Sequence, residues 1–310
     1  MDTRDWALVI FTICAQMAVG SFIILGVVHF FVERKSGLQE ADRMSDRALL
    51  AIGPVLVLGT LASFLHLGSP INGWRAISNI DSSWLSREIL FNVLFMGAGA
   101  VFAVMQWRKL STATIRNAIA VVAALIGVVL VVSMSQVYMI RTVPAWDTVA
   151  TVLSFFTTTF LLGAMAMGTA YAANYTYMQR KSEPGCGPEG AQCDLLRYAL
   201  RGLAVASIVL VGVTFVIMPL YMGYLSNDSA ATQQSADIIV NDYGVVLGLR
   251  LALVFLGAVL LGGFIYRTAS DPTRERWMIN LAYTAFALVL ISEVLGRFLF
   301  YASQITSGLG

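Results

Sequence analysis

The sequence contains little charge and few side chains that can bind a metal. Asp, Glu, Lys and Arg make up only 12% of its 310 residues, whereas 58% are hydrophobic and the mean hydropathy is +0.76. Soluble domains carry about 25% charged residues, so this composition excludes an ordinary pair of soluble domains. The net charge of +2 provides no basic surface for a nucleic acid, and we expect no such partner.

Cysteine is scarce, and its spacing excludes the familiar metal sites. Cys14 lies inside an apolar run, and Cys186 and Cys193 share one loop. Three cysteines cannot form a disulfide scaffold, and none shows the C-x-x-C spacing of zinc or iron–sulfur sites. We therefore expect no metal and no iron–sulfur cluster in this protein.

Eight apolar runs are long enough to cross a membrane as helices. A hydrocarbon core of about 30 Å requires about 20 residues per helix. The predicted fold class is therefore all-α, an integral membrane protein in which residues 1–310 form one polytopic domain, a bundle of eight transmembrane helices. We expect the spans at about residues 6–32, 49–67, 89–107, 119–140, 149–173, 198–225, 245–266 and 277–301.

Lysine and arginine are concentrated in alternate loops, and basic loops resist translocation. One set of loops contains Arg34, Lys35, Arg43, Arg47, Arg108, Lys109, Arg116, Arg180, Lys181, Arg197, Arg267, Arg274 and Arg276. The opposite set contains Arg4, Arg75, Arg87 and Arg141. This asymmetry predicts that both termini lie on the outer, periplasmic side of a bacterial inner membrane. An odd number of spans is the alternative, and it would place one basic loop outside.

Ionisable side chains inside a membrane are costly, so each is a functional candidate unless it pairs with another or lines a cavity. With the predicted spans, the inner half contains chiefly His29 and Arg201. Most candidates fall at the outer ends of helices instead. They are His66, Arg87, Glu88, Arg141, Asp147, Arg250, Glu293 and Arg297.

The two histidines cannot hold a haem between them. His29 lies toward the inner end of the first span and His66 at the outer end of the second. At a rise of 1.5 Å per residue, roughly 25 Å of membrane depth separates them. Since a bis-histidine haem needs both ligands on one iron, we expect no haem in this protein.

Several of the outer residues also have a purely structural interpretation. Glu293 and Arg297 are spaced i,i+4 with the glutamate first, which favours an intrahelical ion pair. Arg250 can pair with Asp242 or with Glu293. Arg87 can serve as an interfacial anchor. The sequence alone leaves these alternatives open.

A histidine beside a carboxylate in the outer leaflet is suited to the oxidation of a quinol, which releases two electrons and two protons. A neutral imidazole can accept one hydroxyl proton, and a carboxylate withdrawn from water can relay the other. His66 and Glu88 are the candidates for these roles. Trp74, Trp84 and Ile71 lie in or beside the connecting loop and can contact the ring or its tail.

The chain resembles the membrane anchor subunit of dimethyl sulfoxide reductase, the DmsC family. The resemblance rests on LHLGSPINGWRAISN followed by SWLSREI, on TVPAWDT, on NDYG with the following LGLR, and on EVLGRFLFY. HLGSP with the downstream EI is its most specific part. These segments extend from the second predicted span to the eighth.

The resemblance implies a haem-free subunit of anaerobic respiration that binds menaquinol. It implies a four-cluster iron–sulfur subunit and a molybdopterin catalytic subunit as partners, with His66 as the quinol-site residue and Glu88 as the matching glutamate. Dimethyl sulfoxide is the leading candidate for the terminal acceptor. The resemblance assigns no role to His29, and it leaves the long loop with Cys186 and Cys193 unexplained.

Two other functions remain open at the level of sequence. A secondary transporter or channel is one, although such proteins often have charges or broken helices at matching midplane positions of two repeats. An anchor without quinol chemistry is the other.

Overall fold

The computed structural model describes residues 3–66, 79–183, 185, 190–268 and 275–307, with the backbone alone described at positions 3, 4, 65, 66, 261 and 275. Helices form all of the regular structure in these ranges. They are α1 (Thr3–Ser36), α2 (Leu38–Leu49), α3 (Ile52–His66), α5 (Trp84–Trp107), α6 (Ala113–Tyr138), α7 (Val149–Arg180), α8 (Ala191–Asn227), α9 (Ala230–Asp237), α10 (Gly244–Val254), α11 (Gly262–Thr268) and α12 (Glu275–Ala302). Two π-helical segments, η3 (Ile238–Asp242) and η4 (Phe255–Leu261), flank α10.

Within the described ranges, eight helical segments are long and apolar enough to cross a membrane, as the sequence predicts. The seventh is continuous through α10, η4 and α11. Several helices are longer than the predicted spans, since α7 continues to Arg180 and α8 begins at Ala191. The added turns are polar and extend beyond the apolar runs by which the spans were recognised.

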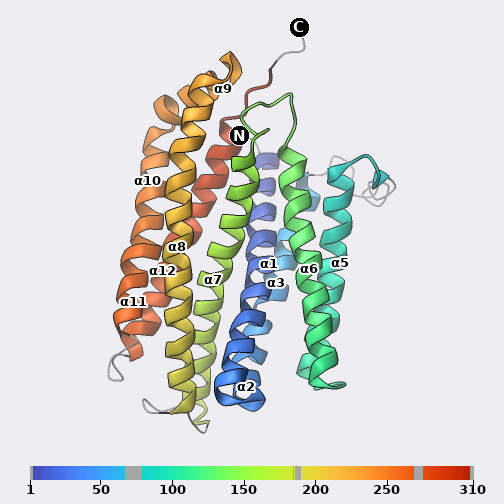
Figure 1. The fold of residues 1–310 in the computed structure, drawn as a ribbon, viewed down its shortest axis with the longest axis vertical. Coiled ribbons are helices and arrows are strands. Elements are labelled where there is room, and N and C mark those ends of the chain that lie inside the picture. Colours follow the sequence, from blue (N-terminus) through green and yellow to red (C-terminus); the bar gives the residue numbers. More distant parts are fainter. Residues whose placement is uncertain (1–2, 67–78, 184, 186–189, 269–274, 308–310) are drawn as a thin grey trace.

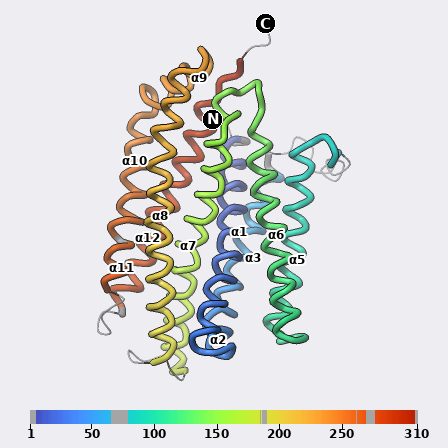
Figure 2. The backbone as a smooth tube through the Cα atoms, viewed as in Figure 1, coloured from blue at the N-terminus to red at the C-terminus, as the bar shows by residue number. Residues whose placement is uncertain are grey.

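The bundle has two recognisable ends (Figure 1). Both chain termini, α9 and the turn between α6 and α7 lie at one end, which we call the terminal end. Helix α2 lies at the other, the opposite end. The tube in Figure 2 shows α1 and α7 at the centre, with α3, α5 and α6 on one side and α8, α10, α11 and α12 on the other.

Two glycines allow α1 and α7 to approach closely. A Cβ on Gly20 would lie 1.8 Å from the Thr159 carbonyl oxygen, and one on Gly163 would lie 2.3 Å from the Gly20 carbonyl carbon. Small residues at such contacts permit the dense packing that drives helix association in lipid. The central pair α1–α7 therefore joins the two halves of the bundle.

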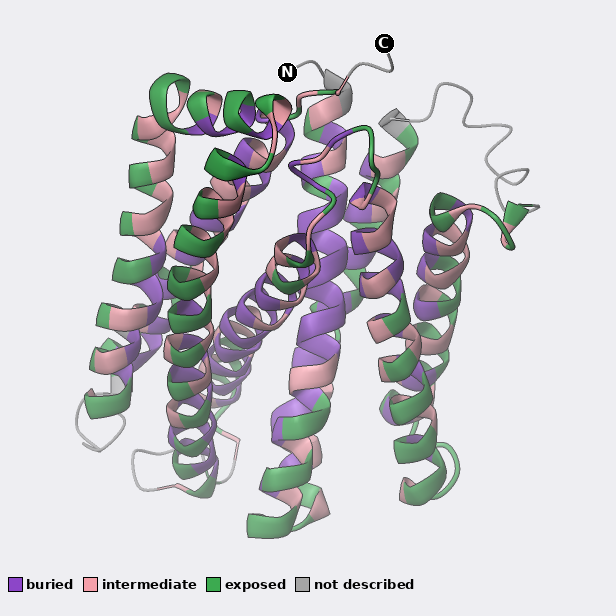
Figure 3. Ribbon diagram, turned by 45° about the horizontal axis from the view of Figure 1, so that its top comes forward, coloured by how far each residue is buried: buried purple, intermediate pink, exposed green. Residues whose placement is uncertain are grey.

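Residues on the outside of the bundle are apolar, as expected for contact with lipid. Figure 3 shows buried residues concentrated along α1, while the outward faces of the peripheral helices are exposed. Leu220, Val216 and Leu125 are among the large apolar side chains on these exposed faces. An aqueous protein rarely exposes such continuous apolar surface, so the burial pattern is that of a multi-pass membrane protein.

Helix α2 is a difference from the sequence prediction, which placed residues 38–48 in a loop. Ala41, Met44 and Ala48 form a buried apolar face. The remaining positions are mostly polar, so a search for long apolar runs cannot detect this short amphipathic helix. It brings Asp42 and Asp46 against neighbouring helices, as described below.

Candidate functional site

Three of the predicted ionisable side chains are buried at the terminal end of the bundle. Glu88 in the first turns of α5, and Glu293 and Arg297 in α12, are each only 4% exposed. Burying a charge in an apolar bundle is costly unless other groups compensate for lost hydration. The surrounding residues show how this compensation is achieved.

Arg297 is held between the two halves of the bundle. Its Nη2 donates to Oε1 of Gln16 in α1 at 2.7 Å, and its guanidinium carbon lies 3.9 Å from the centre of the Phe155 ring in α7. Gln16 in turn donates from Nε2 to the Phe155 carbonyl oxygen at 3.1 Å. A charge-assisted hydrogen bond and a cation–π contact together compensate for the burial of this charge.

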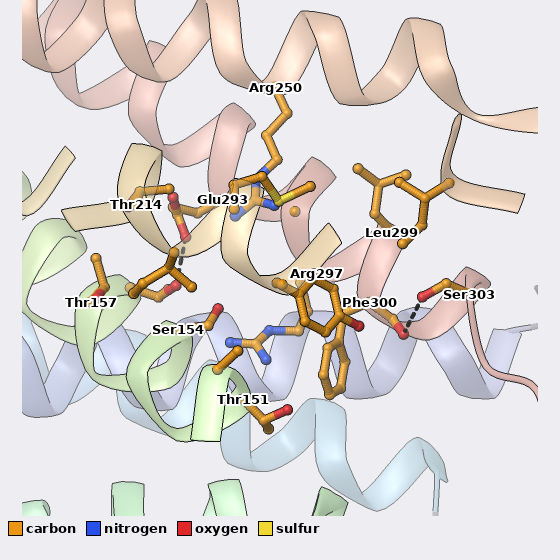
Figure 4. Close-up of a pocket in the computed structure, with 17 residues that line it drawn as sticks. Thr151, Ser154, Thr157, Thr214, Arg250, Glu293, Arg297, Leu299, Phe300 and Ser303 are labelled. Atoms are coloured by element: carbon orange, nitrogen blue, oxygen red, sulfur yellow. Dashed lines mark hydrogen bonds between the residues drawn. The ribbon is translucent and has the colours of Figure 1, made fainter. Parts of the chain in front are cut away.

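Glu293 accepts a hydrogen bond from the hydroxyl of Thr158 in α7 at 2.6 Å. Glu293, Arg297 and Arg250 also line a cavity of about 80 Å³ between α7, α8, α10 and α12, which we call the terminal-end cavity. Figure 4 shows Arg250 and Glu293 projecting from facing helices, with Arg297 beside Phe300. The other polar groups of the wall are the hydroxyls of Thr151, Ser154, Thr157, Thr158, Thr214, Tyr221 and Ser303.

The guanidinium of Arg250 lies directly over Gly296. A Cβ at position 296 would approach its Nε to 2.5 Å, so only glycine allows this contact. Within the described residues, no ion pair shorter than 4.0 Å includes Arg250, Glu293 or Arg297. The structural alternatives considered from sequence, a Glu293–Arg297 pair and a pair of Arg250 with Asp242 or Glu293, are therefore not formed. These groups face a cavity instead.

Glu88 lies near an aromatic wall at the same end of the bundle. Tyr138 at the end of α6 and Tyr301 in α12 share a hydrogen bond of 2.6 Å between their hydroxyls. The Glu88 carboxylate is close enough to interact electrostatically with both phenols, and Arg297 interacts with both as well. The phenol pair thus links the surroundings of Glu88 to those of Arg297.

Further aromatic packing fixes this wall in place. The Trp146 and Phe300 rings are stacked with centroids 5.0 Å apart, and Nε1 of Trp146 donates to the Phe300 carbonyl oxygen at 2.9 Å. Tyr138 meets both rings edge to face. The AWD turn seen in the sequence therefore supplies Trp146 to the packing around the polar groups.

Arg87, Arg141 and Asp147, which were also predicted from the sequence, do not line the terminal-end cavity. Arg87 donates to the carbonyl oxygens of Ile80 and Asp81 and lies 4.2 Å from the Trp84 ring centre, so it anchors the start of α5. Arg141 and Asp147 are exposed in the turn between α6 and α7 and do not line the terminal-end cavity.

Three of the predicted residues lie partly or wholly outside the described residues. Helix α3 ends at His66, but only the backbone of this residue is described. Ile71 and Trp74 lie outside the described residues altogether.

Sequence reasoning missed the neutral polar residues of this region. Gln16, Tyr138 and Tyr301 lie within or beside apolar runs and Thr158 is the middle one of three consecutive threonines, and a search for charges does not detect them. Gln16 was the easiest of these residues to recognise from the sequence, because a buried glutamine in the middle of a membrane span needs a hydrogen-bonding partner. The polar side chains at the terminal end, taken together, provide hydrogen-bonding groups and proton acceptors.

The part of the chain that the structure describes contains no candidate metal site. No group of three or more His, Cys, Asp or Glu side chains lies close enough there to hold an ion. The polar groups around Glu88, Glu293 and Arg297 are instead carboxylates, guanidiniums, phenols and hydroxyls.

Comparison with known proteins adds an independent observation. Residues 1–303 match the family model for the DMSO reductase anchor subunit (DmsC). The sequence is 27% identical to the C chain of the anaerobic dimethyl sulfoxide reductase of Escherichia coli, over 99% of this protein and 97% of that one. It is 29% identical to the C chain of the Haemophilus influenzae reductase, over 97% and 95%. It is also 30% identical to the C subunit of the sulfite dehydrogenase of Allochromatium vinosum, over 44% of each protein.

Proposed function

The chain belongs to the DMSO reductase anchor subunit family, and from this premise we propose that it oxidises menaquinol and passes the electrons to an iron–sulfur subunit of its complex. It is a multi-pass membrane protein and the membrane anchor of a molybdoenzyme complex. The observation that carries the proposal is the burial of Glu88 at the end of the bundle where α3 ends at His66.

The proposed chemistry assigns one proton to each of two groups. The imidazole of His66 accepts a proton from one quinol hydroxyl, and the carboxylate of Glu88 accepts the other as the ring gives up two electrons. Burial of Glu88 supports its assignment, because a carboxylate removed from water is better suited to bind a proton than an exposed one. Trp74 is proposed to contact the quinol ring.

Residues of the surrounding wall have supporting roles in this proposal. Arg297, held by Gln16, orders the Tyr138–Tyr301 pair near Glu88. Arg250 and Glu293 provide polar groups in the terminal-end cavity. Arg87 in the first turn of α5 and Arg141 and Asp147 in the turn between α6 and α7 lie at the same end. They are proposed to help position the quinol site or the partner.

The proposed orientation places the terminal end on the periplasmic side of a bacterial inner membrane. Its support is the concentration of Lys and Arg in the loops of the opposite end. A four-cluster iron–sulfur subunit and a molybdopterin catalytic subunit then dock at the terminal end. Electrons travel directly from the quinol to a nearby cluster, which requires neither haem nor cluster in the anchor itself.

The test compares two electron donors in the purified complex. We expect His66→Ala and Glu88→Gln each to lower menaquinol-dependent reduction of dimethyl sulfoxide by about 100-fold or more, the range of general acid–base catalysis. Reduction with a soluble viologen dye, which bypasses the membrane subunit, should be unchanged. Asp228→Asn is the matched control, because Asp228 is an exposed carboxylate at the same end.

Each outcome of this comparison is informative. Loss of both activities would mean that the substitution disrupts the complex, and a blot for the three subunits would identify that case. Full menaquinol turnover in both variants, with assembly intact, would refute the site and leave an anchor without quinol chemistry.

A further inference from the structure

A second cavity lies at the opposite end of the bundle, far from the residues proposed to oxidise quinol. It has a volume of about 430 Å³ and lies between α1, α2, α5 and α6; we call it the opposite-end cavity. Phe22 and Leu25 of α1, Phe102 of α5 and Ala120 and Ala124 of α6 are among its apolar walls. Its volume is within the range of about 300–1,000 Å³ typical of sites for small ligands.

One end of this cavity is polar and links α2, α5, α6 and the loop between α5 and α6. Lys109 donates to Asp42 at 2.8 Å and to Asp46 at 2.7 Å. Gln106 donates from Nε2 to the same two carboxylates at 2.7 and 2.8 Å, and its Oε1 accepts from Nε of Arg116 at 2.9 Å. Asp46 and Gln106 line the cavity, and the other three side chains are bonded to these two; we call the five together the floor.

His29 lies where this floor meets the walls. Its Nε2 is 3.1 Å from Oδ1 of Asp42, and its Nδ1 is 3.9 Å from Glu33. His29, Glu33, Asp46, Gln106 and Asn117 all line the cavity. A carboxylate bound to one imidazole nitrogen fixes the orientation of the ring, as in histidines that bind ligands through the other nitrogen.

The charges of the floor disfavour an anionic ligand. The floor and its described neighbours carry the carboxylates of Glu33, Asp42 and Asp46 and the cations Lys109, Arg116 and Arg34, the last lying 4.2 Å from the centre of the Phe30 ring. The charges therefore balance around the cavity, but the charged side chains that line it are Glu33 and Asp46. An anionic head such as a lipid phosphate is disfavoured beside these carboxylates, whereas a neutral head with oxygen atoms can form hydrogen bonds there.

The cavity is open to the membrane rather than to water. Val27, Phe30, Phe31 and Val121 line it and are about half exposed, on the outward face of the bundle. A ligand can consequently enter from the lipid, with an apolar tail that remains among acyl chains. The ligand that fits is neutral, lipid-soluble and bears hydrogen-bonding oxygens at one end.

We propose that the opposite-end cavity is a second binding site for an isoprenoid quinone, with the ring between the apolar walls and its oxygens at His29 and Asn117. This inference takes the class of its ligand, and nothing else, from the proposed function. The residues that form the second site include neither His66 nor Glu88. The site binds quinone from the leaflet opposite to the one where quinol is oxidised.

The experiment counts quinones bound to the purified complex after delipidation and saturation with a short-chain menaquinone analogue. Two analogues per complex are expected for the unmodified protein. Gly26→Leu should reduce the count to one, because Gly26 lines the cavity and a Cβ there meets no atom within 4 Å. Gly97→Leu, at an equally open position of α5 outside the cavity, is the matched control and should retain two.

His29→Ala tests the polar end separately and should also reduce the count to one. A photoreactive form of the analogue should label residues of α1 or α6 in the unmodified protein, and this labelling should disappear in Gly26→Leu. A quinone count unaffected by Gly26→Leu, or labelling of α1 and α6 that persists in that variant, would overturn the proposal.

Mass spectrometry of co-purified lipids distinguishes the competing occupant. Loss of one phospholipid in Gly26→Leu, with the quinone count unchanged, would identify a phospholipid site and would also overturn the proposal. The result is separable from the proposed function, which depends on turnover in His66 and Glu88 variants. Either inference can fail while the other stands.

Discussion

The hydrogen bond between Arg297 and Gln16 joins the two halves of the bundle, and its strength can be measured as a coupling energy. Arg297→Met removes the guanidinium, and Gln16→Leu removes its acceptor. We expect the two substitutions to be coupled, because each eliminates the same 2.7 Å contact. The double variant should therefore be less destabilised than the sum of the single variants.

The expected magnitude follows from the environment of the contact. Hydrogen bonds to charged groups contribute about 1.5–3 kcal/mol in soluble proteins. Hydrogen bonds between membrane helices average only about 0.6 kcal/mol and reach about 1.7 kcal/mol. Since Arg297 is 4% exposed and its bond is short, we expect a coupling of about 1.5 kcal/mol, near the upper end of the membrane range.

The single Arg297→Met variant is a poorer test than the double-mutant cycle. Loss of the bond to Gln16 and of the contact with Phe155 destabilises the fold, but removal of a buried charge also removes its desolvation cost. These effects oppose each other in the single variant. The cycle isolates the pairwise contribution, provided that neither substitution creates a new contact.

The assay is equilibrium unfolding of the purified protein in mixed micelles by titration with dodecyl sulfate, followed by circular dichroism. Arg267→Met provides the control, since Arg267 is exposed at the opposite end of the bundle and should show no coupling with Gln16→Leu. A coupling energy below about 0.3 kcal/mol for Arg297 and Gln16 would contradict the view that this bond holds the halves together.

Two further variants test the packing of the central helices and of the aromatic wall. Gly163→Ala should destabilise the protein by about 1–3 kcal/mol in the same titration, because its Cβ would overlap the Gly20 backbone, whereas Gly97→Ala should be neutral. Tyr301→Phe should cost about 1 kcal/mol, since Tyr138 loses its partner, and should slow menaquinol turnover more than viologen-dependent turnover. Equal stability of the two glycine variants, or an unchanged donor ratio in Tyr301→Phe, would contradict these expectations.

Membrane spans were predictable because hydrophobic length is a local property of the sequence. Eight apolar runs correspond to eight helical segments in the described residues, and the family resemblance was confirmed over residues 1–303. Helix ends were less predictable, as the end of α7 and the start of α8 show, because these turns are polar and packed against other helices. The amphipathic helix α2 was missed for the same physical reason.

Grouping of the candidate residues could be predicted only in part. Membrane depth alone indicated that Arg250, Glu293 and Arg297 lie at one level, and the structure places all three around one cavity. Depth could not indicate which helices face each other, so it could not predict that Glu88 does not line the cavity that these three residues share. Lateral helix packing depends on contacts between distant segments, and no local pattern encodes it.

The same limitation explains why the polar network at the opposite end was not expected. Asp42, Asp46 and Lys109 belong to segments that were predicted to be inner loops, and only the charge of Lys109 was used, to infer orientation. Helix α2 brings the two aspartates to Lys109 beside His29, so the residues that set the topology also form the floor of a cavity. Charge in a membrane protein can therefore serve insertion and binding together, and a count of basic residues per loop cannot distinguish the two roles. The two roles can be distinguished only when the bonded partners of each basic residue are known. Arg267 is an exposed cation, whereas Lys109 is bonded to two carboxylates.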